Sequence, residues 1–555
     1  MSAARRATLL VFLVACLVYG FGLGSFGLIA RGEPRYAAVA RGMLRSGDLV
    51  TPRLNGLTYL DKPPLLHWMN AASMALCGET EGAFRLPTML CAALCTALVY
   101  GMARRVFGPR EALCSTVMLG SSLLWFCMAR HARFDMPLAA VITGALWGCW
   151  WASEGGRERR FGYVGAAGLL GLGMLTKGPI ALVLVGVPCL LALALTRRLG
   201  ALRHVPWALC IGLFLVLTVP WYWACERANP GYLAFFFGHE NAWRLTREAP
   251  VRQPWWHTIA FLLGGILPWT LCVPGAVRRA WRDLRHPDDA AGRFTLLLGL
   301  CVLTTIAVYI PPPVKFIQYI IPAVPAVALL IGRHLTGPGR EGRWSLLSSG
   351  ALALLSGAGV GVFGQRLFPQ AGLPAAVMTP VWAGCLLVGG IVVLATAAAN
   401  RRELACVALA AALIVPLHVT YGFVGKAPPH VITEQPVLAA VARHATPGEA
   451  LVCYGYTPPS ALYYYPYGVM SVGDPVSEYD YPGNMGHTEG KWVPFAREAE
   501  VLTTAPAKLG LARPTYWRQV QARWSRHVRL LEECPPYMIF ETVPTAQVGG
   551  NGGSS

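Results

Sequence analysis

The sequence predicts a polytopic α-helical membrane protein with a small α/β domain at its C-terminal end. Three observations predict this fold class. The 555-residue chain is 55% hydrophobic and 14% charged, with a mean hydropathy of +0.46, which is too apolar for a soluble protein of this length. Apolar segments of about 20 residues, the length that a transmembrane helix needs, recur up to residue 422. Beyond residue 424 the apolar runs become short.

About thirteen segments are long and apolar enough to cross a bilayer as helices. They are 8–28, 84–106, 111–129, 136–153, 161–175, 178–196, 205–223, 258–277, 294–310, 317–334, 345–363, 377–398 and 404–422. The first segment follows Arg5 and Arg6 and has the pattern of a secretory signal, but the later spans favour a retained signal anchor. We therefore expect a transmembrane domain over residues 1–423.

Arginines in alternate short loops predict the orientation of these spans. Loops enriched in Arg lie on the cytoplasmic side, and the N-terminus falls on that side with them. The arginines are Arg104, Arg105, Arg110, Arg157, Arg159, Arg160, Arg197, Arg198, Arg203, Arg278, Arg279, Arg282, Arg285, Arg293, Arg333, Arg340, Arg343, Arg401 and Arg402. The long loop 30–84 and the part after residue 424 then lie on the outer side. The net charge of +19 indicates contact with membrane lipids and their anionic head groups, and not with nucleic acid.

The outer loop 30–84 carries an unusual set of polar residues. Its carboxylates, cations and phenols are Glu33, Asp61, Arg35, Arg41, Lys62, Tyr36 and Tyr59. This chemistry beside a bilayer suits the binding of an anionic lipid head group and the movement of a proton, and an ordinary solvated loop is the alternative. Apolar residues at helical spacing in 36–46 and 65–76 predict two short helices that lie at the membrane interface.

Three further groups of ionisable residues lie on the same predicted face. Asp135 begins the fourth span, where capping of that helix is the alternative to a functional role. Lys177 lies in a turn between two spans that is too short to be a flexible solvated loop. His239 lies in the next outer loop and has a structural role as its alternative, while Lys315 and Tyr319 follow a turn of three prolines.

Together these residues are suited to group transfer from a phospholipid-linked donor. The cations that would neutralise a phosphate are Arg35, Lys62, Lys177 and Lys315, and the carboxylates that would activate a hydroxyl are Glu33, Asp61 and Asp135. The cations would also stabilise the phosphate as it leaves the sugar. No ligand spacing dedicated to a metal occurs, and a divalent metal near Glu33, Asp61 and His239 is left open as a cofactor.

The part from 424 to 545 predicts a small α/β domain on the outer side. We expect helices near 436–444, 493–505 and 515–531 and strands at 450–455, 469–472 and 536–543. Its tyrosines either line a sugar site or pack against the membrane domain; they are Tyr454, Tyr456, Tyr463, Tyr464, Tyr465 and Tyr467. Cys453 and Cys534 also lie here, and a disulfide between them is left open. The Gly- and Ser-rich tail 546–555 predicts disorder.

These motifs resemble those of the GT-C membrane glycosyltransferases, which include the protein O-mannosyltransferases, and most closely those of the lipid A aminoarabinose transferases. The family motif runs D-E-x-R-Y-A, S-G-D-W, P-x-L-x-G and Y-F-E-K-P, and it stands here as GEPRYA at 32–37, SGDL at 46–49, PRLNG at 52–56 and YLDKP at 59–63. Further matches are Asp135 with Pro137, the TKG at 176–178, His239, and Lys315 with Tyr319. The first acid of the D-E pair, which usually has the catalytic role, is Gly32 here. The resemblance therefore implies that Glu33 replaces it as the base, or that the activity is altered or absent.

The resemblance implies the GT-C fold and an active site on the periplasmic face of the bacterial inner membrane. It implies transfer of a sugar from undecaprenyl phosphate to lipid A or a related envelope glycan. By this resemblance Lys62, Arg35 and Tyr319 bind the lipid phosphate, and a cavity is lined by Asp61, Tyr59, Asp135, Lys177 and His239. The donor sugar stays open, since transfer of a hexose to a protein or another glycolipid would use the same fold. A flippase for polyprenyl-linked sugars and a catalytically silent lipid-binding relative are the alternatives from other classes.

Overall fold

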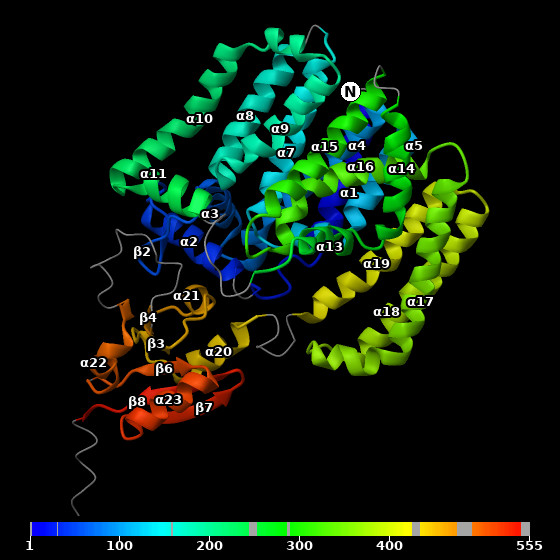
Figure 1. Cartoon of the computed structure of the whole chain (residues 1–555). Helices are drawn as coiled ribbons and strands as arrows, with labels where there is room; N and C mark the ends of the chain where they lie inside the picture. Colours follow the sequence, from blue (N-terminus) through cyan, green and yellow to red (C-terminus); the bar gives the residue numbers. More distant parts are fainter. Residues whose placement is uncertain are drawn as a thin grey trace, which may run out of the picture.

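The computed structural model describes residues 3–29, 32–156, 159–243, 252–285, 289–424, 433–473, 491–504 and 506–545. Up to residue 424 the described chain is almost entirely helical, and a mixed sheet follows it. Figure 1 shows the helical bundle above and the sheet below, with the helices α2 and α3 between them. The predicted tail 546–555 lies outside the described residues.

The helical part begins with α1 (Ala3–Gly20), which is followed by the short helices α2 (Glu33–Ser46) and α3 (Leu65–Cys77) and, between them, the hairpin of β1 (Arg53–Leu54) and β2 (Leu57–Thr58). The remaining helices are α4 (Glu81–Val106), α5 (Pro109–Ser121), α6 (Leu123–Ala129), α7 (Asp135–Ser153), α8 (Arg159–Lys177), α9 (Ile180–Leu195), η1 (Leu199–His204), α10 (Trp207–Ala228), α11 (Tyr232–Ala234), η2 (Phe235–Trp243), α13 (Trp256–Gly265), η3 (Thr270–Cys272), α14 (Val273–Asp283), α15 (Ala290–Tyr309), η4 (Ile317–Ala323), α16 (Val324–Leu335), α17 (Glu341–Gln370), α18 (Ala375–Ala398) and α19 (Arg402–Val424).

Eight of the described helices or helical segments are long and apolar enough to cross a membrane. Two bent pairs raise this number to 10: α5 with α6, bent by 67°, and α13 with Thr270–Asp283, bent by 110°. Every predicted span coincides with one of these ten or with α7, α8 or α9, which are 19, 19 and 16 residues long. Within the described residues, eight segments, or ten if each bent pair is one span, thus meet the criteria of length and apolar character, and a thirteen-span topology stays a prediction.

The two interfacial helices lie where the sequence predicts them. The apolar face of α2 packs against α3 through Ala37, Ala40 and Met74. Its other apolar side, with Val39 and Met43, covers the hairpin of β1 and β2. Because both apolar sides of α2 are buried, its first turn is held in a fixed place beside the bundle.

The chain after residue 433 forms a small α/β unit. Its elements are α20 (Gln435–His444), β3 (Leu451–Tyr454), α21 (Ala461–Tyr464), β4 (Val469–Val472), β5 (Trp492–Val493), η7 (Phe495–Arg497), α22 (Ala499–Leu502), β6 (Leu509–Ala512), α23 (Pro514–Trp524), β7 (Val528–Cys534) and β8 (Tyr537–Thr542). The strand order is β5-β4-β3-β6-β8-β7, with parallel pairing from β5 to β6 and antiparallel pairing of β8 with both of its neighbours.

Two predicted helices of this unit differ from the structure, and the disulfide that was left open is not formed. The region near 493–505 contains β5, η7 and the short helix α22 in place of one helix. The predicted helix 515–531 ends at Trp524, because the chain from Val528 pairs with β8 as a strand. Cross-strand packing thus overrides the helical pattern of that stretch. Cys453 and Cys534 are free thiols. They lie in β3 and β7, which are separated by two strands spaced about 4.8 Å apart, too far for a disulfide.

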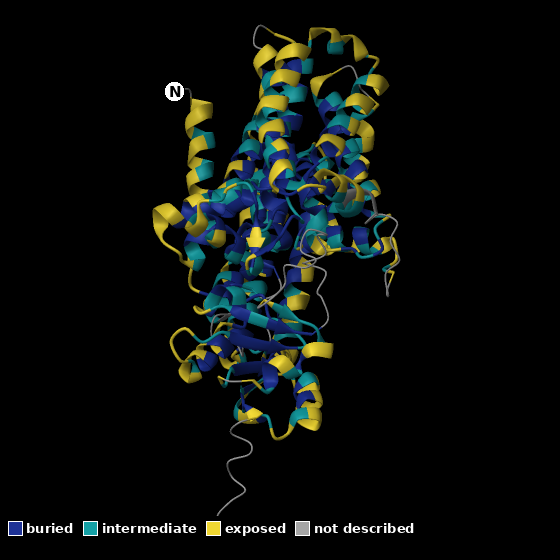
Figure 2. Cartoon of the chain, turned by 90° about the vertical axis from the view of Figure 1, so that its left-hand side faces the viewer, coloured by how far each residue is buried: buried dark blue, intermediate teal, exposed yellow. Residues whose placement is uncertain are grey.

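Tyrosines of this unit dock it on the helical part. The Tyr464 hydroxyl accepts a hydrogen bond from the backbone N–H of Leu28 (2.8 Å) and donates one to Glu81 (3.1 Å). The guanidinium of Arg41 lies 4.5 Å from the centre of the Tyr463 ring. Figure 2 shows buried residues concentrated where the bundle meets the interfacial helices and in the sheet. Of the two predicted roles, packing against the membrane domain therefore describes Tyr463 and Tyr464.

Candidate active site

The first group of predicted site residues meets around Asp61, in what we call the Asp61 cluster (Tyr59, Asp61, Lys62, His239 and Glu240). Lys62 Nζ donates to Oδ1 and to the backbone oxygen of Asp61, both at 2.8 Å, and the Tyr59 hydroxyl donates to Oδ2 at 3.1 Å. Glu240 Oε2 lies 3.7 Å from Lys62 Nζ, and its Oε1 lies 3.6 Å from His239 Nδ1. Solvent still reaches 15% of the Lys62 side chain and 22% of the Asp61 side chain, so a ligand can contact both.

Tyr59 connects this cluster to the first turn of α2. Burial raises the pKa of Tyr59 well above its ordinary value, and the charge of Asp61 adds to this, while a hydrogen bond with Arg35 acts in the opposite direction. The phenol therefore stays protonated and donates to Asp61. Tyr36 lies on the same side, with its ring centre 5.0 Å from Phe134 and 6.0 Å from His67.

The second group meets around Asp135, in what we call the Asp135 cluster (Asp135, Lys177, Tyr309 and Tyr319). Lys177 Nζ donates to Asp135 Oδ1 at 2.5 Å and lies 4.6 Å from the centre of the Tyr319 ring. Tyr319 stacks on Tyr309 with ring centres 4.8 Å apart. No side-chain capping bond is found at the start of α7, so Asp135 acts as a partner of Lys177 and not as a cap. The turn after Lys177 is made by Gly178 at φ 79°, a conformation that suits glycine at a helix end.

Asp135 and Lys177 are expected to behave as one buried unit, because only 9% and 13% of their side chains are exposed. Asp135→Asn or Lys177→Met alone leaves one charge uncompensated, and we expect each to destabilise the fold by about 3–5 kcal/mol. The double variant removes both charges and is expected to cost less than the sum of the two. Thermal unfolding in detergent measures this cycle. The exposed pair Arg497–Glu500 is the control, and equal, additive losses in both cycles would contradict the expectation.

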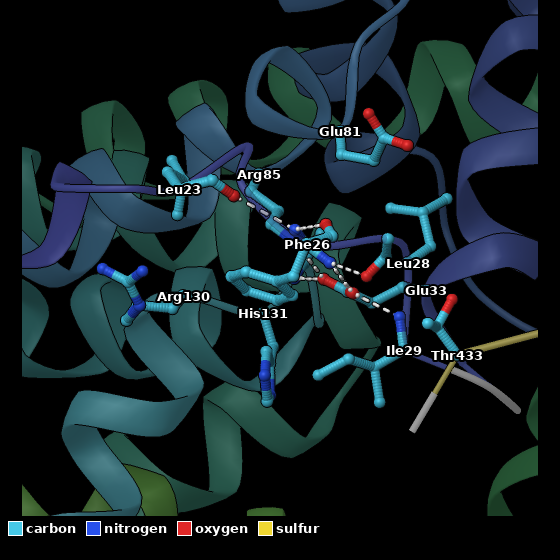
Figure 3. Close-up of polar contacts among 12 residues, drawn as sticks. Leu23, Phe26, Leu28, Ile29, Glu33, Glu81, Arg85, Arg130, His131 and Thr433 are labelled. Carbon is cyan, nitrogen blue, oxygen red and sulfur yellow. Dashed lines mark hydrogen bonds and ion pairs between the residues drawn. The ribbon is translucent and has the colours of Figure 1, made fainter. Parts of the chain in front are cut away.

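Glu33 has a different environment from the one expected for a catalytic base. It is 1% exposed, and its carboxylate accepts four hydrogen bonds (Figure 3). Oε1 accepts from Arg85 Nε (3.0 Å) and the backbone N–H of Ala132 (2.8 Å), and Oε2 accepts from Arg85 Nη2 (2.6 Å) and the backbone N–H of Ile29 (2.9 Å). Burial alone would raise the pKa of Glu33, but the charge and hydrogen bonds of Arg85 outweigh it and lower the pKa to about 2.

Arg85 is fully occupied as well. Besides Glu33, its guanidinium donates to the backbone oxygens of Leu23 (3.0 Å), Phe26 (2.9 Å) and Gly27 (2.9 Å). The pair thus fastens α2 to α4 and to the chain that follows α1. The base role predicted for Glu33 does not fit this geometry, because the carboxylate is ionised, saturated and closed to solvent. Sequence reasoning missed Arg85, although a charged residue inside a predicted span is itself a signal.

Lys315 also differs from its prediction. It is 5% exposed, and its Nζ donates to the backbone oxygens of Gln253 and Pro312, each at 2.9 Å. These bonds hold the turn before η4 and direct the ammonium group into the protein's own backbone. A role in phosphate binding therefore does not fit Lys315.

The divalent metal left open near Glu33, Asp61 and His239 has little support in the donor set. Within the described residues no group of three or more His, Cys, Asp or Glu side chains is arranged to hold a metal ion. Glu33 is enclosed by Arg85. A metal near Asp61 and His239 would compete with the ammonium group of Lys62, which already lies against Asp61.

Two histidines, the buried His67 and the partly exposed His131, predict how the stability of the fold depends on pH. Burial lowers the pKa of His67 to about 3 and that of His131 to about 4, so both are neutral in the folded protein. In the unfolded chain a histidine takes up a proton below about pH 6.5. Their contribution to the free energy of unfolding is therefore complete above pH 6.5. It is lost as the pH falls towards 4, by about 1.4 kcal/mol per pH unit for each histidine.

We thus expect the melting temperature in detergent to fall between pH 6.5 and 4. His131→Gln is expected to weaken this dependence of the melting temperature on pH, while the same change at the exposed His204 leaves the dependence unchanged. A melting temperature that stays constant across this range would contradict the expectation.

Comparisons with known proteins show what this chain is similar to. Residues 61–223 match the family model of the dolichyl-phosphate-mannose-protein mannosyltransferases. The undecaprenyl phosphate-α-4-amino-4-deoxy-L-arabinose arabinosyl transferase of Pseudomonas paraeruginosa is 32% identical over 336 residues, which are 60% of this chain and 60% of that protein. The enzyme of the same name from Edwardsiella ictaluri is 30% identical over 336 residues, 59% of each chain. The similarity thus spans about 60% of the length of these relatives.

Solved structures extend the similarity over the whole fold. The crystal structure of ArnT from Cupriavidus metallidurans bound to undecaprenyl phosphate has a TM-score of 0.82 at 23% identity, and the match covers 98% of this chain and 99% of that chain. The archaeal oligosaccharyltransferase AglB from Archaeoglobus fulgidus has a TM-score of 0.50 at 13% identity, with 92% and 70% covered. These likenesses show the fold.

Proposed function

On the premise that this chain is a GT-C membrane protein similar to the aminoarabinose transferases, we propose that it is a glycosyltransferase that uses an undecaprenyl-phosphate sugar. The acceptor that we propose is lipid A or a related envelope glycan. A pentose of the aminoarabinose type is the first donor to consider, because the relatives carry that sugar in their names. We place the reaction on the periplasmic face of the bacterial inner membrane, with the N-terminus in the cytoplasm.

The observation that carries this proposal is the partly exposed ion pair of Lys62 and Asp61. The ammonium group of Lys62 lies between two carboxylates, Asp61 and Glu240, which hold it in one place. The phosphate of a lipid donor can take over the contacts of Lys62, with Arg35 close by through Tyr59. As the bond between the sugar and the phosphate breaks, charge grows on the leaving phosphate, and a fixed cation stabilises that charge more than it stabilises the bound donor.

The Asp135 cluster supplies the second polar wall in this proposal. Tyr319 lies over the ammonium group of Lys177, and Phe134, the neighbour of Asp135, packs against Tyr36 of α2. The side chains of Asp61 and Asp135 are 22% and 9% exposed, whereas that of Glu33 is 1% exposed, so we assign Glu33 to the support of the site. No metal is required for any of these contacts.

Transfer in proteoliposomes tests the function directly. The protein is supplied with a panel of radiolabelled undecaprenyl-phosphate sugars, including aminoarabinose and hexoses, and with extracted envelope lipids. Label in a lipid A fraction supports the proposal and identifies the sugar. Donor binding without transfer to any acceptor would mean a silent lipid-binding relative. Parallel reactions after dialysis against EDTA decide whether a divalent metal takes part.

A further inference from the structure

Gly32 stands where the family motif has an acid, and the side chain of Arg133 lies beside it. A Cβ placed on Gly32 would lie 2.7 Å from Nη2, 3.0 Å from Cζ and 3.2 Å from Nη1 of Arg133. The guanidinium of Arg133 therefore fills the space that a side chain at residue 32 would occupy. Gly32 is also the residue that precedes α2, and no side chain caps this helix end.

Arg133 differs from the other cations of the site in its partners. Each carboxylate that was a candidate base already has a cation: Glu33 has Arg85, Asp61 has Lys62 and Asp135 has Lys177. Arg133 makes no hydrogen bond or ion pair with any residue in the described part of the chain. Its side chain is half-buried, and its guanidinium lies against Gly32.

We propose that Arg133 and the missing side chain of Gly32 form a subsite for an anionic group, a phosphate or a carboxylate, on one of the two substrates. This inference rests on the proposed glycosyl transfer, since it names a substrate feature for that reaction. A guanidinium binds phosphate and carboxylate through paired hydrogen bonds, and it is always charged. An acid at residue 32 would pair with Arg133 and repel such a group, so its absence is needed for the subsite.

The anionic group has two chemical sources, the acceptor or the donor sugar. With a phosphate monoester as acceptor, no base is needed, because its second pKa is about 6 and it is a dianion at neutral pH. One of its oxygens forms the bond to the sugar's anomeric carbon while the bond from that carbon to undecaprenyl phosphate breaks. The donor is a phosphate diester with one negative charge, and it leaves as undecaprenyl phosphate, a monoester with two. The acceptor phosphate changes from a monoester with two charges to a diester with one, so the charges balance and no proton moves. With an acidic donor sugar, Arg133 instead binds the sugar carboxylate, and Asp61 or Asp135 takes the proton of an acceptor hydroxyl.

The test compares Gly32→Asp with Gly32→Asn, which add side chains of the same size and differ in charge. Both are expected to fold, because φ of Gly32 is −136° and the crowded atoms are the mobile end of Arg133. Binding of lipid A and of phosphatase-treated lipid A is measured in detergent, and transfer is measured with neutral, amino and acidic donor sugars. We expect the Asp variant to bind the anionic substrate roughly 10- to 100-fold more weakly than the Asn variant does. Arg133→Gln is expected to show the same loss, and Arg133→Lys to recover part of it.

Each outcome has a separate meaning. A loss confined to phosphorylated acceptor assigns the subsite to the acceptor, and a loss confined to acidic donors assigns it to the sugar. Equal effects of Asp and Asn at residue 32 on all substrates, or an Arg133→Gln variant with unchanged affinities and KM values, would overturn the subsite. Charge-selective binding that depends on Arg133, without transfer by the unaltered protein, would retain the subsite and remove the proposed function.

Discussion

Replacing Arg85 with Leu is expected to abolish or severely reduce the yield of folded protein. The change leaves the Glu33 carboxylate buried at 1% exposure without its cation, and it leaves the backbone oxygens of Leu23, Phe26 and Gly27 without their donor. Removing one partner of a buried ion pair costs about 3–5 kcal/mol, a large part of the stability of a typical domain. The monodisperse fraction after detergent extraction and the melting temperature measure the effect.

Arg45→Leu is the matched control for this prediction. Arg45 also pairs with a glutamate, Glu79, but 64% and 32% of these side chains are exposed. An exposed pair contributes about 0–1 kcal/mol, so the control is expected to fold normally. Equal yields and melting temperatures for the two variants would contradict the anchoring role of Arg85.

Glu33→Gln separates anchoring from catalysis at the same position. The amide keeps the shape of the side chain but leaves Arg85 with a neutral partner, so we expect a lower melting temperature and retained turnover per folded molecule. A normal melting temperature with turnover lost would restore Glu33 as the base. Since its pKa of about 2 lies below that of an unfolded glutamate, the stability from this pair is present above about pH 4.3 and is lost as the pH falls towards 2.

Lys62→Ala is expected to lower the turnover with an undecaprenyl-phosphate donor by about 100- to 1000-fold, with a normal melting temperature. The ammonium group is the partly exposed cation that we assign to the leaving phosphate, and loss of one preorganised donor to a developing charge has this magnitude in other enzymes. Initial rates of label transfer in proteoliposomes measure it. Lys62→Arg keeps the charge and is expected to retain part of the activity.

The matched control is Lys491→Ala, which removes an exposed lysine from the small α/β unit. It is expected to leave transfer at the level of the unaltered protein. A Lys62→Ala variant that transfers label at that same level would exclude Lys62 from the reaction. A parallel fall in melting temperature and activity would instead indicate that Lys62 mainly holds Asp61 and Glu240 together.

Much of the fold could be predicted from local sequence pattern. The apolar segments are helices at the predicted places, because a run of about 20 apolar residues is stable in the hydrocarbon core of a bilayer as a helix. The interfacial helices α2 and α3 followed from apolar residues at helical spacing. The stretch 525–531 was assigned to a helix in error: the helix ends at Trp524, and from Val528 the chain pairs with β8 as a strand.

The candidate site was predictable as a set of residue types but not as a set of roles. The motif at 59–63 identified Tyr59, Asp61 and Lys62, which indeed lie together because they are neighbours in the sequence. Glu240 adjoins His239 in the sequence, but no role was predicted for it. Glu33 and Lys315 were assigned to chemistry because a sequence shows a charge but does not show which buried groups already neutralise it.

Composition and spacing along the chain were enough to predict the membrane class, the helical segments, the two interfacial helices and the polar residues of the first loop. Which charges are paired could be seen only in the folded protein. Glu33 meets Arg85 across 52 residues and Asp135 meets Lys177 across 42, while Arg133 lies against Gly32 without a carboxylate. The physical reason is that the state of a charge depends on burial and on partners within a few ångströms, and folding brings these partners together from distant parts of the chain.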